Sequence, residues 1–415
     1  MKLDKFKFAV FLLSAIIFLW SYQLPLGAGN VPIYVVFSII SILFYSVDFL
    51  FFIFLSGGLL IHFLTSLLFG PGFENVYKSV FGYILLDAVL VSTSSVFAFL
   101  ISEKALEKAF YNVYSNGIYA LFILQLIQIV FQFLGLYESG YYHYFLPIPR
   151  VSGFFYEPSH FAIALSPLIF YIVVFYRRFI EVFGVKFFSV FVFSCFFDLS
   201  STLFLIFLLS FFSRFIIFYS RSYWFPVGVI FAIILVCFSA GLLFYYSPDF
   251  SDRLSTLWLL VFQGENPDTT FNPSSLLFYK GLESMLYSAE NYPLGVGMLN
   301  MSSISIFSSV SQLNDFYEEQ NSHDGTSMLF KMLSEFGFFS IVLFFGLVKV
   351  FNKVKISSIE KAYFQSEYLV LLCFVFPIIS SMVRGSSYFD GGVILSISIL
   401  LGIVFRNRMV SKGEL

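Results

Sequence analysis

Charged residues are scarce in this chain of 415 residues. Only 12% of the residues are charged and 59% are hydrophobic, including 62 Phe, whereas soluble domains carry about 25% charged residues. The composition therefore excludes an ordinary soluble protein. The net charge of −2 gives no indication of an acidic or basic partner, and we expect no nucleic-acid binding.

Cysteine is also scarce, and its positions argue against a disulfide-stabilised protein and against a cysteine-bound metal site. The three Cys, at positions 195, 237 and 373, all lie inside apolar runs, so they are predicted to be small buried residues and not a disulfide framework. No Asp, Glu, His and Cys cluster has the spacing of metal ligands, and we expect neither a metal nor a cofactor. The N-terminus lacks a small-residue cleavage site, which argues against a cleavable signal peptide.

Long apolar runs, by contrast, fill the chain. Twelve are long enough to cross a bilayer or nearly so, and they predict an all-α polytopic membrane protein folded as one domain over residues 1–415. They lie at about 6–22, 31–47, 49–69, 79–101, 117–136, 158–176, two within 187–218, 224–245, 326–348, 367–383 and 393–405. The only long polar region, residues 247–325, is predicted to be a large, partly helical loop, with an amphipathic helix at about residues 276–289.

The distribution of Lys and Arg predicts the orientation, because cytoplasmic loops carry the excess of these residues. All but six of the 23 Lys and Arg fall on one side if the N-terminus is cytoplasmic. Twelve spans then place both termini in the cytoplasm and the 247–325 loop outside. The six exceptions are Lys78, Arg150, Arg253, Lys280, Lys331 and Arg384.

Three of these outward cations, Arg150, Arg253 and Arg384, lie close to predicted helix ends. Arg keeps its charge and presents a planar fork that binds phosphate through two hydrogen bonds. They would suit a lipid-linked phosphate or diphosphate. The alternative for each is a loop ion pair, for example Arg253 with Asp252 or Arg384 with Asp390.

A motif of unusual polarity opens the 158–176 run. It reads Arg150-x2-Gly153-x3-Glu157-Pro158, with His160 two residues later. Pro158 favours the first position of a helix and disfavours helical dihedrals at Glu157, so Glu157 is predicted at the mouth of a membrane helix. Ionisable residues there suggest a function. The structural alternative is that Glu157 caps the helix and pairs with Arg150, and His160 could simply face a neighbouring helix.

A second polar motif ends the outer loop. His323-Asp324 precedes the 326–348 run, which places His323 at the same membrane face as Glu157. A histidine in contact with water can accept a proton near neutral pH. The alternative is a loop histidine hydrogen-bonded to Asp324.

These motifs carry a resemblance. Arg150-x2-Gly153-x3-Glu157-Pro158 resembles the signature of the O-antigen polymerase (Wzy-type) and O-antigen ligase superfamily. Pro293-Leu-Gly295-Val-Gly297 resembles the turn that ends the helical part of that family's periplasmic loop, and the run from Ser322-His323 to Leu333-x-Glu335-x-Gly337 resembles its His motif. Arg253 and Gly264 match an Arg-x10-Gly spacing, whereas Asn272-Pro-Ser-Ser275 stands where the family often has a second Arg.

The resemblance implies a GT-C-like enzyme of the bacterial inner membrane, with its site facing the periplasm. Such an enzyme moves a glycan from undecaprenyl diphosphate onto the next lipid-linked repeat unit, inverting the anomeric carbon and needing no metal. It implies His323 as base with Glu157 second, and Arg150, Arg253, Lys280 and Arg384 as diphosphate ligands. Gly153, Pro158, His160 and Asp324 would be supporting residues. The bilayer is an expected partner and a polysaccharide chain-length regulator a candidate one.

Two alternatives remain open. The nearer one is an O-antigen ligase, which would transfer the glycan to lipid A–core, although Glu157-Pro158 favours a polymerase. The more distant one is a flippase for lipid-linked oligosaccharides. Transporters carry ionisable residues at the bilayer midplane and show repeat symmetry, whereas here Asp87 is the clearest mid-span charge and no repeat is evident.

Overall fold

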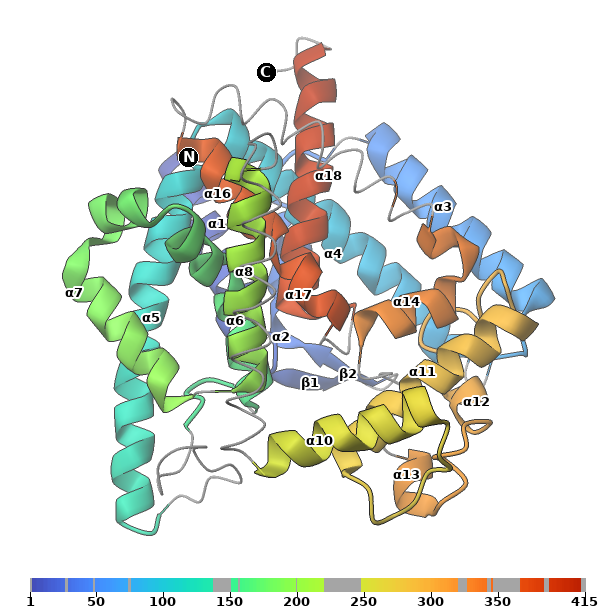
Figure 1. Ribbon diagram of the computed structural model, residues 1–415. Helices are drawn as coiled ribbons and strands as arrows, with labels where there is room; N and C mark the ends of the chain where they lie inside the picture. The colour runs from blue at the N-terminus through green and yellow to red at the C-terminus, as the bar shows by residue number, and fades with distance from the viewer. Residues whose placement is uncertain are drawn as a thin grey trace.

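A computed structural model gives the fold of the chain (Figure 1). It describes residues 2–26, 29–47, 49–73, 76–136, 151–155, 157–198, 200–219, 248–319, 327–341, 345, 366–383 and 388–411. The described chain is mostly helical, with a single short hairpin. Its helices are α1 (Lys2–Phe18), α2 (Ile33–Ser41), α3 (Phe49–Phe69), α4 (Val76–Ser102), α5 (Leu106–Phe133), α6 (Pro158–Val174), α7 (Tyr176–Phe197), α8 (Ser201–Tyr219), α10 (Pro248–Trp258), α11 (Pro273–Asn291), α12 (Ser302–Ser305), α13 (Asp315–Glu319), α14 (Met328–Phe336), α16 (Ser366–Val375), α17 (Pro377–Val383) and α18 (Gly391–Ser411).

The predicted all-α membrane character is confirmed in its coarse form. Among the described residues, four helices are long and apolar enough to cross a membrane, with spans at Phe52–Phe69, Val76–Ser102, Leu106–Phe133 and Tyr176–Phe197. The predicted helix at 276–289 lies inside α11, and the predicted break between the two runs within 187–218 falls between α7 and α8. The run at 224–245 lies outside the described residues.

The chain departs from the predicted spans at several points. The expected loop after α1 is an antiparallel hairpin of β1 (Gln23–Leu26) and β2 (Gly29–Pro32), in which Gln23 pairs with Pro32. The 31–47 run yields only the nine-residue α2. The run at 326–348 is interrupted at Gly337, whose φ is 50°, and the run at 367–383 is divided into α16 and α17 just before Pro377, because proline cannot continue the hydrogen-bonding ladder.

Two neighbouring helices of similar character, α3 and α4, differ in burial. Helix α4 is largely buried and α3 largely exposed. The exposed surface of α3 is apolar, as expected for a lipid-facing helix, whereas α4 carries small polar residues and packs closely on α18. Thr93 of α4 hydrogen-bonds Ser398 of α18, and a Cβ on Gly402 would lie 3.0 Å from the Ser94 carbonyl oxygen. Small residues allow such close helix–helix approach in membranes.

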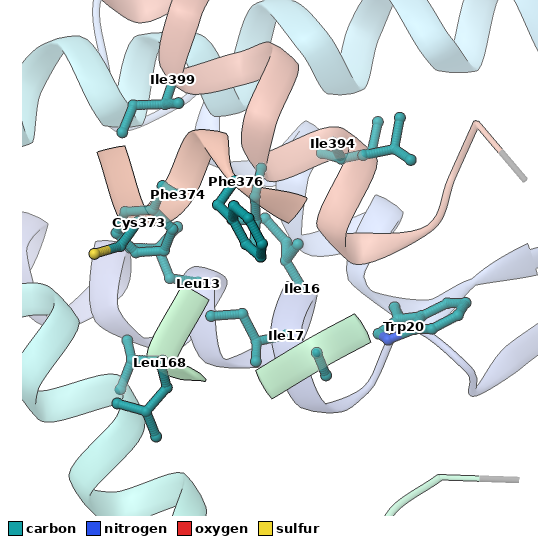
Figure 2. Packing of buried hydrophobic residues seen from close by; sticks show 14 of the residues in the cluster. Leu13, Ile16, Ile17, Trp20, Leu168, Cys373, Phe374, Phe376, Ile394 and Ile399 are labelled. Carbon is teal, nitrogen blue, oxygen red and sulfur yellow. The ribbon is translucent and has the colours of Figure 1, made fainter. Parts of the chain in front are cut away.

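The core forms where α1, α6, α16, α17 and α18 meet. Leu13 and Ile16 of α1, Leu168 of α6, Phe374 of α16 and Ile394 of α18 are all buried there, and Figure 2 shows them close to one another. Cys195 and Cys373 are free and buried, as predicted, and Cys237 lies outside the described residues.

The two ends of the described chain lie at one end of the molecule, and α10 to α13 gather towards the opposite end (Figure 1). The α10–α13 region therefore lies away from both ends of the described chain.

Candidate functional site

The N-terminus of α6 forms where Pro158 predicts it. Glu157 occupies the N-cap position with an extended backbone (φ −128°, ψ 148°), and Pro158 is the first helical residue. The Glu157 carboxylate accepts a hydrogen bond from Ser159 Oγ at 3.0 Å. Among the described residues it accepts none from a backbone amide of the first turn, so the structural alternative of a capping carboxylate is wrong in that detail. The carboxylate is half-buried at the helix mouth.

The segment just after Arg150 is held by two glutamines of α5. Gln128 accepts a hydrogen bond from the Gly153 amide and donates one to the Gly153 carbonyl, both at 3.0 Å. Gln125 donates to the Val151 carbonyl at 2.9 Å. Gly153 has a φ of 62°, a backbone conformation that favours glycine, and a Cβ there would lie 2.3 Å from Leu121 Cδ1, so the Leu121 side chain would have to move. Arg150 itself lies outside the described residues.

His160, in the first turn of α6, faces a neighbouring element. Its ring packs on Trp20 at the end of α1, with the ring centroids 4.5 Å apart. Trp20 in turn contacts the start of α18, because a Cβ on Gly391 would lie 3.1 Å from Trp20 Cδ1. His160 therefore helps to seat α6 against the end of α1 and the start of α18.

The residues just before α18 contact both α2 and α14. Tyr34 donates a hydrogen bond to the Phe389 carbonyl at 2.6 Å, and Asp390 is buried beside it. The Lys331 ammonium of α14 lies 5.5 Å from the centre of the Tyr388 ring, within the range of a cation–π contact.

The flanks of two predicted site residues also meet here. Ser327, four residues after His323, donates to the Met382 carbonyl at 2.6 Å, and Met382 is two residues before Arg384. His323, Asp324 and Arg384 themselves lie outside the described residues.

Two of the glycine motifs form one unit. The amides of Val296 and Gly297 donate to the carbonyls of Ser334 and Glu335, both at 3.0 Å, and the Phe338 amide donates to the Pro293 carbonyl at 2.8 Å. We call this unit, residues 293–300 with 333–338, the glycine interlock.

The glycines of the interlock are sterically required. A Cβ on Gly295 would lie 2.3 Å from the Glu335 carbonyl oxygen, and a Cβ on Gly337 would lie 2.3 Å from the Pro293 carbonyl oxygen. Both have positive φ, 92° and 50°. The two glycines therefore let the turn and the end of α14 approach to backbone contact.

The interlock also contains a buried carboxylate and binds the α3–α4 pair. Glu335 is fully buried, and its Oε2 accepts a hydrogen bond from the Leu299 amide at 2.9 Å.

The interlock is also hydrogen-bonded to α4. The Met298 amide donates to the Tyr83 hydroxyl of α4 at 3.1 Å, and Tyr83 hydrogen-bonds His62 of α3. The interlock thus ties α14, which follows the His323 motif, to α3 and α4.

The predicted diphosphate ligand Lys280 is used differently. Its ammonium is buried and donates to the carbonyls of Tyr317 at 2.6 Å and Glu318 at 2.8 Å. Burial lowers the pKa of Lys280 to about 8, while the nearby Glu318 acts in the opposite direction. We therefore correct the assignment of Lys280: it fixes α13 to α11, and its charge is directed to the protein backbone.

Arg253 lies on α10 and contacts the start of α11. Its carbonyl accepts from Ser275 Oγ at 2.9 Å. Asn272 stands where the related family often has Arg, and it caps α11 by accepting the amides of Ser274 at 3.1 Å and Ser275 at 3.4 Å. Asn272 also donates to Asp252 at 3.1 Å. The second phosphate contact, which that Arg often makes in the related family, is left to Arg253 or Lys280 in this chain, and the Lys280 ammonium is already bound to two backbone carbonyls.

The sequence analysis did not single out several residues that contact the candidate site. Trp20 and Lys331 carry no local motif. Gln125 and Gln128 could have been found, because two glutamines three residues apart share one face of an apolar helix, and a polar face in a membrane helix indicates a buried partner.

Comparisons with protein-family models, with curated proteins and with solved structures find no match to the chain. Within the described part of the chain, no group of three or more His, Cys, Asp or Glu lies close enough to hold a metal ion.

Proposed function

We propose that the protein is a membrane glycosyltransferase that polymerises lipid-linked oligosaccharide repeat units, the activity that its resemblance to O-antigen polymerases implies. The substrate would be a glycan on undecaprenyl diphosphate, presented at the outer face of the inner membrane. The acceptor would be the next lipid-linked repeat unit.

The observation that supports this proposal most is the glycine interlock. Two segments singled out for their resemblance to the family, Pro293–Gly297 and Leu333–Gly337, are bound to each other backbone to backbone. Residues 151–153, between Arg150 and Glu157, are likewise hydrogen-bonded to α5 through Gln125 and Gln128. Such rigid support is what a site needs if its charged groups are to meet a substrate in a fixed geometry.

The chemistry requires charge stabilisation and one proton transfer. A hydroxyl oxygen of the acceptor sugar bonds to the anomeric carbon of the donor, the bond from that carbon to the diphosphate oxygen breaks, and the electron pair leaves with the diphosphate. Arg150, Arg253 and Arg384 would stabilise this departing charge. His323, or Glu157 in second place, would take the proton of the attacking hydroxyl, an assistance worth about 10²–10⁴ in rate.

The test is polymer formation from purified lipid-linked repeat units by parent and Arg150 variants. If Arg150 binds the diphosphate through its planar fork, Arg150→Lys is strongly impaired, and Arg150→Ala loses about 10²–10³ in turnover, the scale for one transition-state donor. The amount of protein in the membrane stays close to that of the parent.

Arg178 provides the matched control. It pairs with Glu107, with 3.1 Å between Nη2 and Oε1, and it belongs to none of the motif segments. Arg178→Ala should keep parental turnover. A well-expressed Arg150→Ala variant with parental turnover would remove Arg150 from the site. Transfer that occurs only after lipid A–core is added would identify a ligase instead.

A further inference from the structure

Helix α10 and the π-helical turn that continues it (Leu259–Gln263) bury one face against α11. Thr256 and Leu260, four residues apart, are both buried. Thr256 accepts the Asn272 amide at 3.3 Å, and Leu260 packs in one apolar cluster with Leu276. This face accounts for how α10 is attached to the loop.

The opposite face of the same segment is apolar and uncovered. Leu254, Trp258, Val261 and Phe262 recur at three- and four-residue intervals, so they form one stripe. Thr256 lies two residues from Leu254 and from Trp258, which puts the buried face about half a turn away. Trp258 is 56% exposed and Phe262 72% exposed, and their rings stack with centroids 4.8 Å apart.

The position of α10 in the chain indicates what covers this stripe. The apolar run at 224–245 ends just before α10 begins at Pro248, so α10 starts where a predicted span leaves the membrane. In Figure 1 α10 lies crosswise to the upright helices α5, α6 and α18, and the outer end of α5 reaches past it. That end of α5 carries exposed apolar side chains, among them Phe131 and Phe133.

We infer that α10 and the π-helical turn lie in the plane of the membrane surface, with Trp258 and Phe262 inserted into the outer lipid monolayer. An in-plane helix buries its apolar face at the boundary between headgroups and acyl chains, and tryptophan is enriched at that depth. This inference is independent of the proposed reaction, but it has a consequence for it: Arg253, on the flank of α10, would lie at the depth of lipid phosphates.

The experiment measures where the Trp258 indole lies. The chain has three Trp, so Trp20→Phe with Trp224→Phe leaves Trp258 as the only one. The protein is reconstituted into vesicles of phosphatidylcholine brominated either near the headgroup or near the chain end. We expect blue-shifted emission, loss of most of it to the shallow bromines, a smaller loss to the deep ones, and little quenching by aqueous iodide.

The matched control moves the indole to a residue of equal exposure. Phe316 of α13 is 54% exposed, and the acidic Asp315 and Glu318 lie beside it in the sequence, so we expect it to face water. Phe316→Trp combined with Trp258→Phe in the same background should respond to iodide and not to brominated lipid. If the Trp20 change impairs folding, the difference between the parent and Trp258→Phe gives the same quantity.

Two results would overturn the inference. Quenching of Trp258 by iodide alone, as in the Phe316→Trp control, would place the stripe in water. Protection from both iodide and brominated lipid would mean that protein covers the stripe, either a second copy of the chain or another partner.

Discussion

The glycine interlock joins the 247–325 region to the end of α14, and a second junction joins α10 to α11 within that region, but the two junctions use different groups. The interlock is made by backbone amides and carbonyls, with glycines where a Cβ would collide. The α10–α11 junction is made largely by side chains, through Asn272, Thr256 and Ser275. A backbone contact leaves no space for a larger residue, whereas a side-chain contact can be rebuilt with other residues.

The same difference separates the motifs that resemble the family from the position that departs from it. Gly295 and Gly337 lie where a Cβ would meet a backbone carbonyl oxygen. Asn272, which stands where that family often has Arg, caps α11, a role that several residue types can fill.

The largest effect is expected from adding a methyl group inside the interlock. Gly337→Ala and Gly295→Ala each place a Cβ 2.3 Å from a carbonyl oxygen and force alanine into positive φ, a conformation that by itself costs on the order of 1–3 kcal/mol. The clash adds to this cost, so we expect loss of folded protein in the membrane. Size-exclusion profiles and thermal unfolding in detergent measure the loss.

Gly264→Ala separates strain from collision. Gly264 also has positive φ, 67°, but nothing lies within 4 Å of a Cβ there. The Gly264→Ala variant should therefore be destabilised only by the unfavourable positive φ of alanine. If Gly337→Ala were as stable as Gly264→Ala, the close approach in the interlock would be disproved.

A smaller effect is expected from the buried carboxylate of the interlock. Glu335→Ala removes the acceptor of the Leu299 amide, and Leu299 holds a positive φ of 61° that this bond helps to stabilise. An unsatisfied buried amide costs about 1–3 kcal/mol, so the free energy of unfolding should fall by about that amount. Glu335→Gln keeps an acceptor oxygen and should lose less. Equal losses in the two variants would show that the Leu299 hydrogen bond is not the cause.

Part of the fold could be predicted from hydrophobicity and proline alone. The 49–69 run coincides with α3, and Pro158 marks the start of α6, because these signals are local. The start of α5 was predicted too late, at residue 117. Its first turns contain Glu107 and Lys108, which lower the average hydrophobicity, yet residues 106, 109, 110, 113 and 114 are buried at helical spacing. Periodicity there was the better guide.

The candidate site could be predicted only as a set of motif segments. The sequence located the mouth of α6 and the glycine motifs, but it could not show that residues 293–297 bind residues 334–338, since this contact depends on the tertiary fold. For the same reason it could not show that Lys280 faces two carbonyls. A lysine on an amphipathic helix looks the same in sequence whether it meets phosphate or protein.

Of the substitutions discussed, Lys280→Met is expected to have the smallest effect on stability at neutral pH. Lys280 is a third side-chain contact of α11, made with α13. Methionine fills a similar space and removes a costly buried charge, but it leaves the carbonyls of Tyr317 and Glu318 without their donor. These two consequences oppose each other. The turnover of correctly folded molecules should stay close to the parental value, whereas a diphosphate ligand would lose turnover or substrate affinity on the same substitution.

The dependence of stability on pH identifies the buried ammonium. Unfolded Lys280 titrates near its ordinary value of 10.5, and folded Lys280 at about 8. Between these values the unfolded chain binds more protons at this residue than the folded chain, so the contribution of Lys280 to the free energy of unfolding rises with pH in this window and is flat below it. Unfolding measured from pH 7 to about pH 10.5 should show this rise in the parent and its loss in Lys280→Met. Identical pH profiles for the two proteins, together with a fall in turnover for the variant, would return Lys280 to the list of diphosphate ligands and would place α11 among the elements that touch the substrate.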